Sequence, residues 1–163
     1  MSLTPENTAE KVLRAAWPDD EFPVDPVTIA RKLGLDVFDT DLPPEVSGAL
    51  IKEAGEDPVI ALHSEDHPNR KRFSCAHEIG HFVARAESGN AEEYEFIDYR
   101  GSLAAQGTDP EEVFANQFAA NLLMPKATVQ KLHKEGKSHI ELALFFGVSA
   151  EAMQYRLNKL GLR

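Results

Sequence analysis

The stretch SCAHEIGHFVAR, residues 74–85, decides how this sequence is interpreted. Apolar residues occupy nearly every side of the helix that it predicts, so the helix is expected to be buried in the core. The same stretch carries His77, Glu78 and His81, polar side chains that cost free energy in a core unless they are satisfied. Two interpretations are open: a core helix that carries two histidines, or a metal site built on a core helix.

The spacing of the histidines favours the metal site. His77 and His81 are four residues apart, so on a helix they lie one turn apart on one face and can hold a metal ion together. Glu78 lies beside the pair, where a carboxylate can take a proton from a metal-bound water. Gly80 costs about 1 kcal/mol in a helix relative to alanine. Its presence indicates that another group approaches the helix closely between the two histidines. Cys75 points away from the His77 face and is predicted to be a small buried residue.

The third ligand of the metal is predicted to be a carboxylate. A catalytic zinc site usually has three protein ligands and an open position for water, and residues 82–96 contain no third histidine. Glu112 is the best candidate because it shares a helical face with Ala115 and Ala119, whose small side chains allow two helices to approach closely. The competing interpretation is that Glu112 caps its own helix together with Asp109. The other candidates for the third ligand are Glu92, Glu93, Glu95 and Glu111.

Composition and charge narrow the class of protein. The chain has 163 residues, which fits one domain, and a net charge of -10 from 17 basic and 27 acidic residues. This charge repels the phosphate backbone of nucleic acids and attracts basic partners, so nucleic-acid binding is not expected. A single cysteine excludes an internal disulfide, and the sequence shows neither a signal peptide nor a membrane-spanning segment. We therefore expect a soluble protein of the cytoplasm without membrane association.

Helix and turn signals predict an α+β fold, namely a helix-rich single domain over residues 1–163 with a small antiparallel sheet. Prolines and capping side chains open most of the predicted helices, and glycines end several of them. The predicted helices cover residues 5–16, 26–33, 68–87, 110–124, a short segment after Pro125, 139–146 and 150–160. The predicted strands are 35–39, 47–53 and 58–63, with one further short element at 94–99.

Four segments occur in the order and at the spacing typical of one known family. They are SGALI at 47–51, RKRFSCAHEIGHF at 70–82, EEVFANQFAANLLMP at 111–125 and LFFGVSAEAMQYRLNKLGL at 144–162. On these motifs the sequence resembles the ImmA/IrrE family of metallopeptidases. The resemblance covers about residues 46–162, and it is most specific where the HEIGH helix is paired with ANQFAANLLMP.

The resemblance implies a zincin-like catalytic core of the thermolysin (gluzincin) type, with His77, His81 and Glu112 as zinc ligands and Glu78 as general base. Zinc is the expected ion, although a set of two histidines and a carboxylate also accepts Mn²⁺ or another divalent ion. The single domain would then consist of opening helices and a first strand over residues 1–45, a catalytic core over 46–125 and a C-terminal helical subregion over 126–163.

The function implied by the resemblance is that of a zinc-dependent endopeptidase, in which Glu78 activates a zinc-bound water for attack on a peptide bond. Members of the family typically cleave or inactivate a helix-turn-helix transcriptional repressor that is encoded nearby. The alternative is a non-proteolytic, metal-binding regulator or toxin component of a toxin–antitoxin-like module, which acts by binding its partner.

The C-terminal segment, residues 139–163, also resembles a helix-turn-helix, because two capped helices flank Phe146-Gly147-Val148. This segment holds three lysine or arginine residues and two glutamates and has no basic stripe, which disfavours direct DNA binding. We expect the two helices to pack against the metal-binding part of the protein instead.

Overall fold

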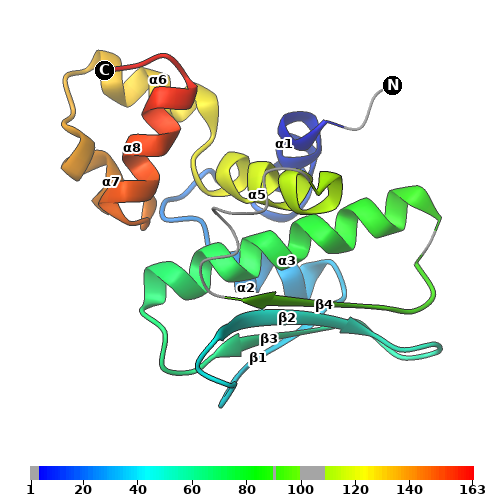
Figure 1. The fold of residues 1–163 in the computed structure, drawn as a ribbon. Coiled ribbons are helices and arrows are strands. Elements are labelled where there is room, and N and C mark those ends of the chain that lie inside the picture. Colours follow the sequence, from blue (N-terminus) through cyan, green and yellow to red (C-terminus); the bar gives the residue numbers. More distant parts are fainter. Residues whose placement is uncertain (1–3, 90, 100–108) are drawn as a thin grey trace.

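The protein combines helices with one small sheet, as a computed structural model of residues 4–89, 91–99 and 109–163 describes it (Figure 1). Its helices are α1 (Pro5–Ala16), α2 (Pro26–Lys32), α3 (Pro68–Ser88), α5 (Pro110–Leu123), α6 (Lys126–Lys134), α7 (His139–Phe146) and α8 (Ala150–Lys159). Its strands are β1 (Asp36–Thr40), β2 (Val46–Lys52), β3 (Val59–His63) and β4 (Tyr94–Tyr99). The predicted α+β class is confirmed. Within these ranges, no helix combines the length and the apolar character that a membrane span requires.

Side-chain caps explain why most helices begin where the sequence predicts. At each of these starts, a side-chain oxygen or, at α3, the ring nitrogen Nδ1 of His67 accepts a hydrogen bond from a backbone N–H of the first turn, which would otherwise be unsatisfied. Ser138 and Glu141 form the predicted reciprocal capping box at the start of α7. The capping residues of the other helices are Thr4, Asp25, His67, Asp109 and Ser149.

The sheet has the strand order β1-β3-β2-β4 and is mixed. Strand β2 runs antiparallel to β3 and to β4, as expected for the 47–53 and 58–63 hairpin. Strand β1 runs parallel to β3, so the expectation of an antiparallel sheet is wrong for this pair. The burial of the strands gives the physical reason. Strand β3 is buried along most of its length and takes a central position, whereas β1 exposes Asp36 and Asp39 and forms an edge.

Helix α3 is the centre of the molecule. It lies between the sheet and α5, with α1 and α2 on the same side of the sheet (Figure 1). Every residue from Ser74 to His81 is buried, which confirms the prediction of a helix buried on all sides. Cys75 is fully buried in the core as predicted, and burial raises the pKa of its thiol.

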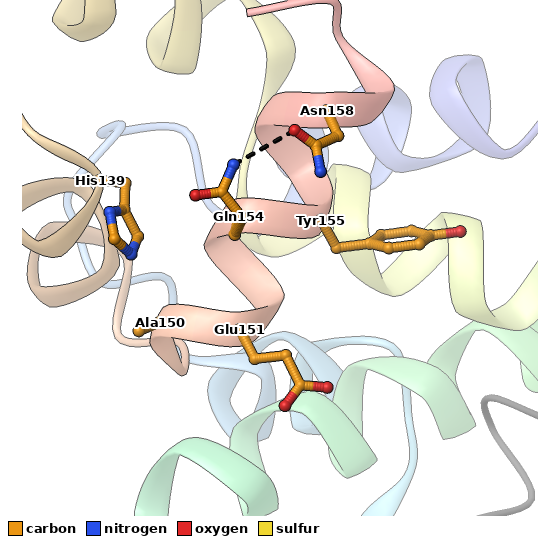
Figure 2. Close-up of a pocket in the computed structure, with 6 residues that line it drawn as sticks. All are labelled: His139, Ala150, Glu151, Gln154, Tyr155 and Asn158. Atoms are coloured by element: carbon orange, nitrogen blue, oxygen red, sulfur yellow. Dashed lines mark hydrogen bonds between the residues drawn. The ribbon is translucent and has the colours of Figure 1, made fainter. Parts of the chain in front are cut away.

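The three C-terminal helices gather at the end of α5 (Figure 1). The buried guanidinium of Arg156 on α8 donates hydrogen bonds to the carbonyl of Met124 (3.1 Å) and to Oδ1 of Asn121 (3.0 Å). These contacts hold α8 against the end of α5, as expected for helices that pack on the rest of the fold. The outer side of α7 and α8 carries an open hollow of ≈ 380 Å³, in which Gln154 donates a hydrogen bond to Asn158 (Figure 2).

Gly80 lies where α3 and α5 make their closest approach. A Cβ atom at this position would lie 3.0 Å from the Cα of Ala115 and 3.2 Å from the Cβ of Phe118. The close approach predicted between the two histidines is therefore that of a second helix.

We expect Gly80→Ala to lower the free energy of unfolding by about 1 kcal/mol or more, because crowding against the α5 backbone outweighs the higher helix propensity of alanine. Urea titration of both proteins in their metal-free form measures the difference. A gain in stability would mean that α3 and α5 can move apart at no cost.

Candidate metal centre

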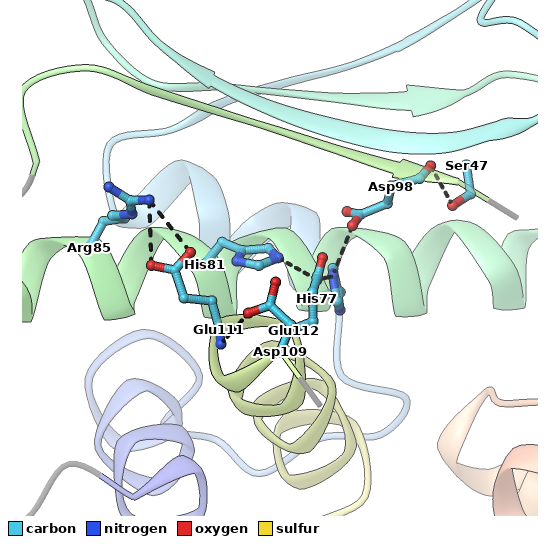
Figure 3. Close-up of polar contacts among 8 residues, drawn as sticks. All are labelled: Ser47, His77, His81, Arg85, Asp98, Asp109, Glu111 and Glu112. Carbon is cyan, nitrogen blue, oxygen red and sulfur yellow. Dashed lines mark hydrogen bonds and ion pairs between the residues drawn. The ribbon is translucent and has the colours of Figure 1, made fainter. Parts of the chain in front are cut away.

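Four side chains of metal-ligand type converge where α3, α5 and β4 meet (Figure 3). One ligand atom from each of His77, His81, Asp98 and Glu112 lies within 4.8 Å of the others. Oε2 of Glu112 is 3.1 Å from Nε2 of His77 and 3.0 Å from Nε2 of His81. Oδ1 of Asp98 is 3.2 Å from the same His77 nitrogen. We call these four residues the His-carboxylate cluster.

Aromatic rings hold the two imidazoles in place. The ring of His81 stacks on Phe96 of β4, with 3.9 Å between centroids and 14° between planes. The ring of His77 stacks more loosely on Phe73, with centroids 6.5 Å apart. Because both histidines are 1% exposed, their rings have little room to rotate away from the cluster.

The first turn of α5 supplies Glu112. Asp109 caps the helix by accepting a hydrogen bond from the N–H of Glu111 (3.0 Å), while the carboxylate of Glu112 reaches the histidines. The structure therefore brings Glu112 to the histidines rather than to the helix cap. Glu111 points the other way and pairs with Arg85 at 3.4 Å (Figure 3). The remaining candidates, Glu92, Glu93 and Glu95, are exposed and lie outside the cluster.

Glu78 is fully buried beside the cluster. Neither of its carboxylate oxygens has a hydrogen-bond partner among the described residues. Strand β2 passes over it at Gly48, where an added Cβ would lie 3.6 Å from Oε2 of Glu78. A buried, unpaired carboxylate costs several kcal/mol of stability, by order of magnitude, so its retention points to a chemical task.

The pKa values of the four side chains in the cluster depend on burial and on their contacts with one another. Burial opposes protonation of His77, but the contacts with Asp98 and Glu112 outweigh it and raise the pKa of His77 to about 9. Burial lowers the pKa of His81. Burial raises the pKa of Asp98. Although burial also opposes ionisation of Glu112, its contacts with His77 and His81 hold the pKa of this carboxyl well below its ordinary value.

The donor set fits a divalent metal ion. Nε2 of His77 faces two carboxylate oxygens, yet a ring nitrogen offers one proton or one lone pair, so it cannot satisfy both. A cation among the donors satisfies all of them at once. Two ligands held about 2.1 Å from one ion in tetrahedral geometry lie about 3.4 Å apart. Three donor pairs of the cluster are 3.0 to 3.2 Å apart, and all four donors lie within 4.8 Å of one another.

Asp98 is the member of the cluster that sequence reasoning missed. The sequence predicts only one short element at residues 94–99, without indicating which of its side chains point inward. In β4 the side chains alternate, and Tyr94, Phe96 and Asp98 are less exposed than the residues between them. The spacing of Asp98 at two-residue intervals from Phe96 and Tyr94 places all three side chains on one face of a strand. This spacing indicates an inward aspartate only if the segment is known to be a strand.

Comparison with known proteins agrees with this geometry. The family described as the IrrE N-terminal-like domain, a peptidase family, matches residues 30–158. The radiation response metalloprotease IrrE of Deinococcus radiodurans is 31% identical over 108 residues, which make up 64% of this chain and 32% of that protein. The similarity thus spans about a third of the length of this relative. Since the family match covers most of the chain and includes the whole His-carboxylate cluster, the chain belongs to the ImmA/IrrE family of metallopeptidases.

Proposed function

We propose that this metallopeptidase is a zinc-dependent endopeptidase in which His77, His81 and Glu112 bind the metal and Glu78 is the general base. The observation that carries the proposal is the approach of both His Nε2 atoms to Oε2 of Glu112, at 3.1 and 3.0 Å. Both histidines lie on α3, the helix that also carries the buried Glu78. Two histidines and one carboxylate are a ligand set of catalytic zinc sites. The same set also accepts Mn²⁺.

Each protein group then has a defined task. Zinc, when bound, lowers the pKa of a water and polarises the peptide carbonyl. Glu78 accepts the proton of the attacking water and later delivers it to the leaving amine. Its carboxylate is suited to this because no hydrogen bond among the described residues competes for its oxygens. Phe96 keeps His81 in place, and the first turn of α5 positions Glu112.

We assign the catalytic chemistry to residues 46–125, with residues 1–45 and 126–163 packed around this core as parts of one domain. Support comes from the location of the cluster, whose members all lie between His77 and Glu112.

The substrate class follows from charge and from the family. A metallopeptidase acts on protein, and we propose that the protein cleaved or inactivated here is a helix-turn-helix repressor encoded nearby, in the cytoplasm. A chain with a net charge of -10 attracts a DNA-binding protein, whose recognition surface is basic. The name of the relative in Deinococcus radiodurans, a radiation response metalloprotease, fits a regulatory role for the peptidase.

Incubating the zinc-loaded protein with the purified product of the neighbouring repressor gene tests the proposal. We expect wild type to cut the repressor into discrete fragments, visible by mass spectrometry, and Glu78→Gln to bind it without cutting. Binding and derepression of equal strength by both proteins, with the repressor intact, would favour instead a non-proteolytic regulator or toxin component.

A further inference from the structure

Asp98 sits on the side of β4 that faces α3. In the sheet it lies opposite Gly48 of β2, a residue without a side chain. Phe96, two residues earlier, stacks on His81 and fixes the position of β4 above the helix. The next inward residue is therefore held above the preceding turn of α3, where His77 lies.

The contacts of Asp98 suit a metal ligand. Its side chain is 5% exposed, and Oδ1 is 3.2 Å from Nε2 of His77, the atom that also faces Glu112. Once that nitrogen binds a metal it has no proton left to donate, so the contact with Asp98 cannot remain a hydrogen bond. Oδ2 of Asp98 has no hydrogen-bond partner among the described residues, and the hydroxyl of Ser47 donates only to the backbone carbonyl of Asp98.

We propose that Asp98 is a fourth protein ligand of the metal in the resting protein. This inference rests on the metal site proposed above and adds a donor to it. With Asp98 included, His77, His81 and Glu112 would be joined by a fourth protein donor, whereas a catalytic zinc site usually has three protein ligands and one open position. The resting site would therefore be closed to water and substrate for as long as Asp98 occupied that fourth position. The second carboxylate also shifts the preference of the site toward ions that favour oxygen, such as Mn²⁺.

Metal titration of the full chain tests this without any substrate. The metal-free protein is titrated with Co²⁺, whose visible absorption reports the number and type of its ligands, and Zn²⁺ affinity is measured by competition with a chelator. The variants are Asp98→Ala, which removes the donor, and Asp98→Asn, which keeps the shape of the side chain. Glu95→Gln is the matched control, because it removes a charge from the exposed side of the same strand. Circular dichroism verifies that each variant is folded.

We expect both Asp98 variants to bind Zn²⁺ at least about tenfold more weakly than wild type, and Glu95→Gln to bind it equally well. Azide should leave the Co²⁺ spectrum of wild type unchanged and should shift that of Asp98→Ala, in which a ligand position has opened. Unchanged affinity and spectra in the Asp98 variants would overturn the inference. So would an azide response that is equal in wild type and variant, since the site would then be open at rest. Failure of wild type to bind one equivalent of metal would overturn the proposed metal site as well.

Discussion

Glu78→Gln is expected to lower kcat for peptide-bond hydrolysis by about 10²- to 10⁴-fold, the usual contribution of a general base. The amide keeps the size and shape of the carboxylate, but it cannot accept the proton of the attacking water. Because Glu78 lies outside the His-carboxylate cluster, the variant should retain one equivalent of metal. Kinetics on the repressor or on a peptide that spans its cleavage site, together with metal analysis of the same sample, measure both quantities.

Glu87→Gln is the control for this variant, because Glu87 is an exposed glutamate on the same helix and should show wild-type kinetics. Loss of metal from Glu78→Gln would show that Glu78 supports the metal site itself. Hydrolysis at the wild-type rate would remove Glu78 from the mechanism.

Glu112→Ala is expected to weaken metal binding by at least about 100-fold and to abolish hydrolysis at metal concentrations that saturate wild type. The carboxylate of Glu112 is the group that both histidines contact, so its removal leaves the two imidazoles without their shared partner. A 100-fold weaker affinity removes up to about 2.7 kcal/mol of the stabilisation that the metal gives to the folded state. Thermal unfolding with and without added Zn²⁺ measures this loss.

The neighbouring Glu111 provides the matched control. Its carboxylate is half exposed and pairs with Arg85, an interaction worth about 1 kcal/mol at most, so Glu111→Gln should bind metal as wild type does. Unchanged metal affinity in Glu112→Ala would contradict the proposed ligand set and would leave Asp98 as the carboxylate that completes it.

Local sequence signals were sufficient to predict the helix starts and the pairing of His77 with His81 on one helix face. Proline and capping side chains lie next to the helix starts that they determine, and residues four apart on a helix share a face whatever surrounds them. The starts of α1, α7 and α8 and the apolar surroundings of His77 and His81 could therefore be predicted from the sequence. Glu112 was identifiable because small residues on its helix indicated close packing against another helix, although helix capping remained an equally local alternative.

Tertiary structure alone decided the arrangement of the strands and the position of Asp98 in the His-carboxylate cluster. Strand β3 lies between β1 and β2 and runs parallel to β1. Which strand takes the central position depends on which one buries the most apolar surface, and this is a property of the whole sheet. Asp98 comes within 3.2 Å of His77 because β4 pairs with β2 and Phe96 stacks on His81. His77 and His81 share a helix face by local geometry, but a carboxylate 21 residues from His77 in sequence reaches it only after the sheet and the helix have packed together.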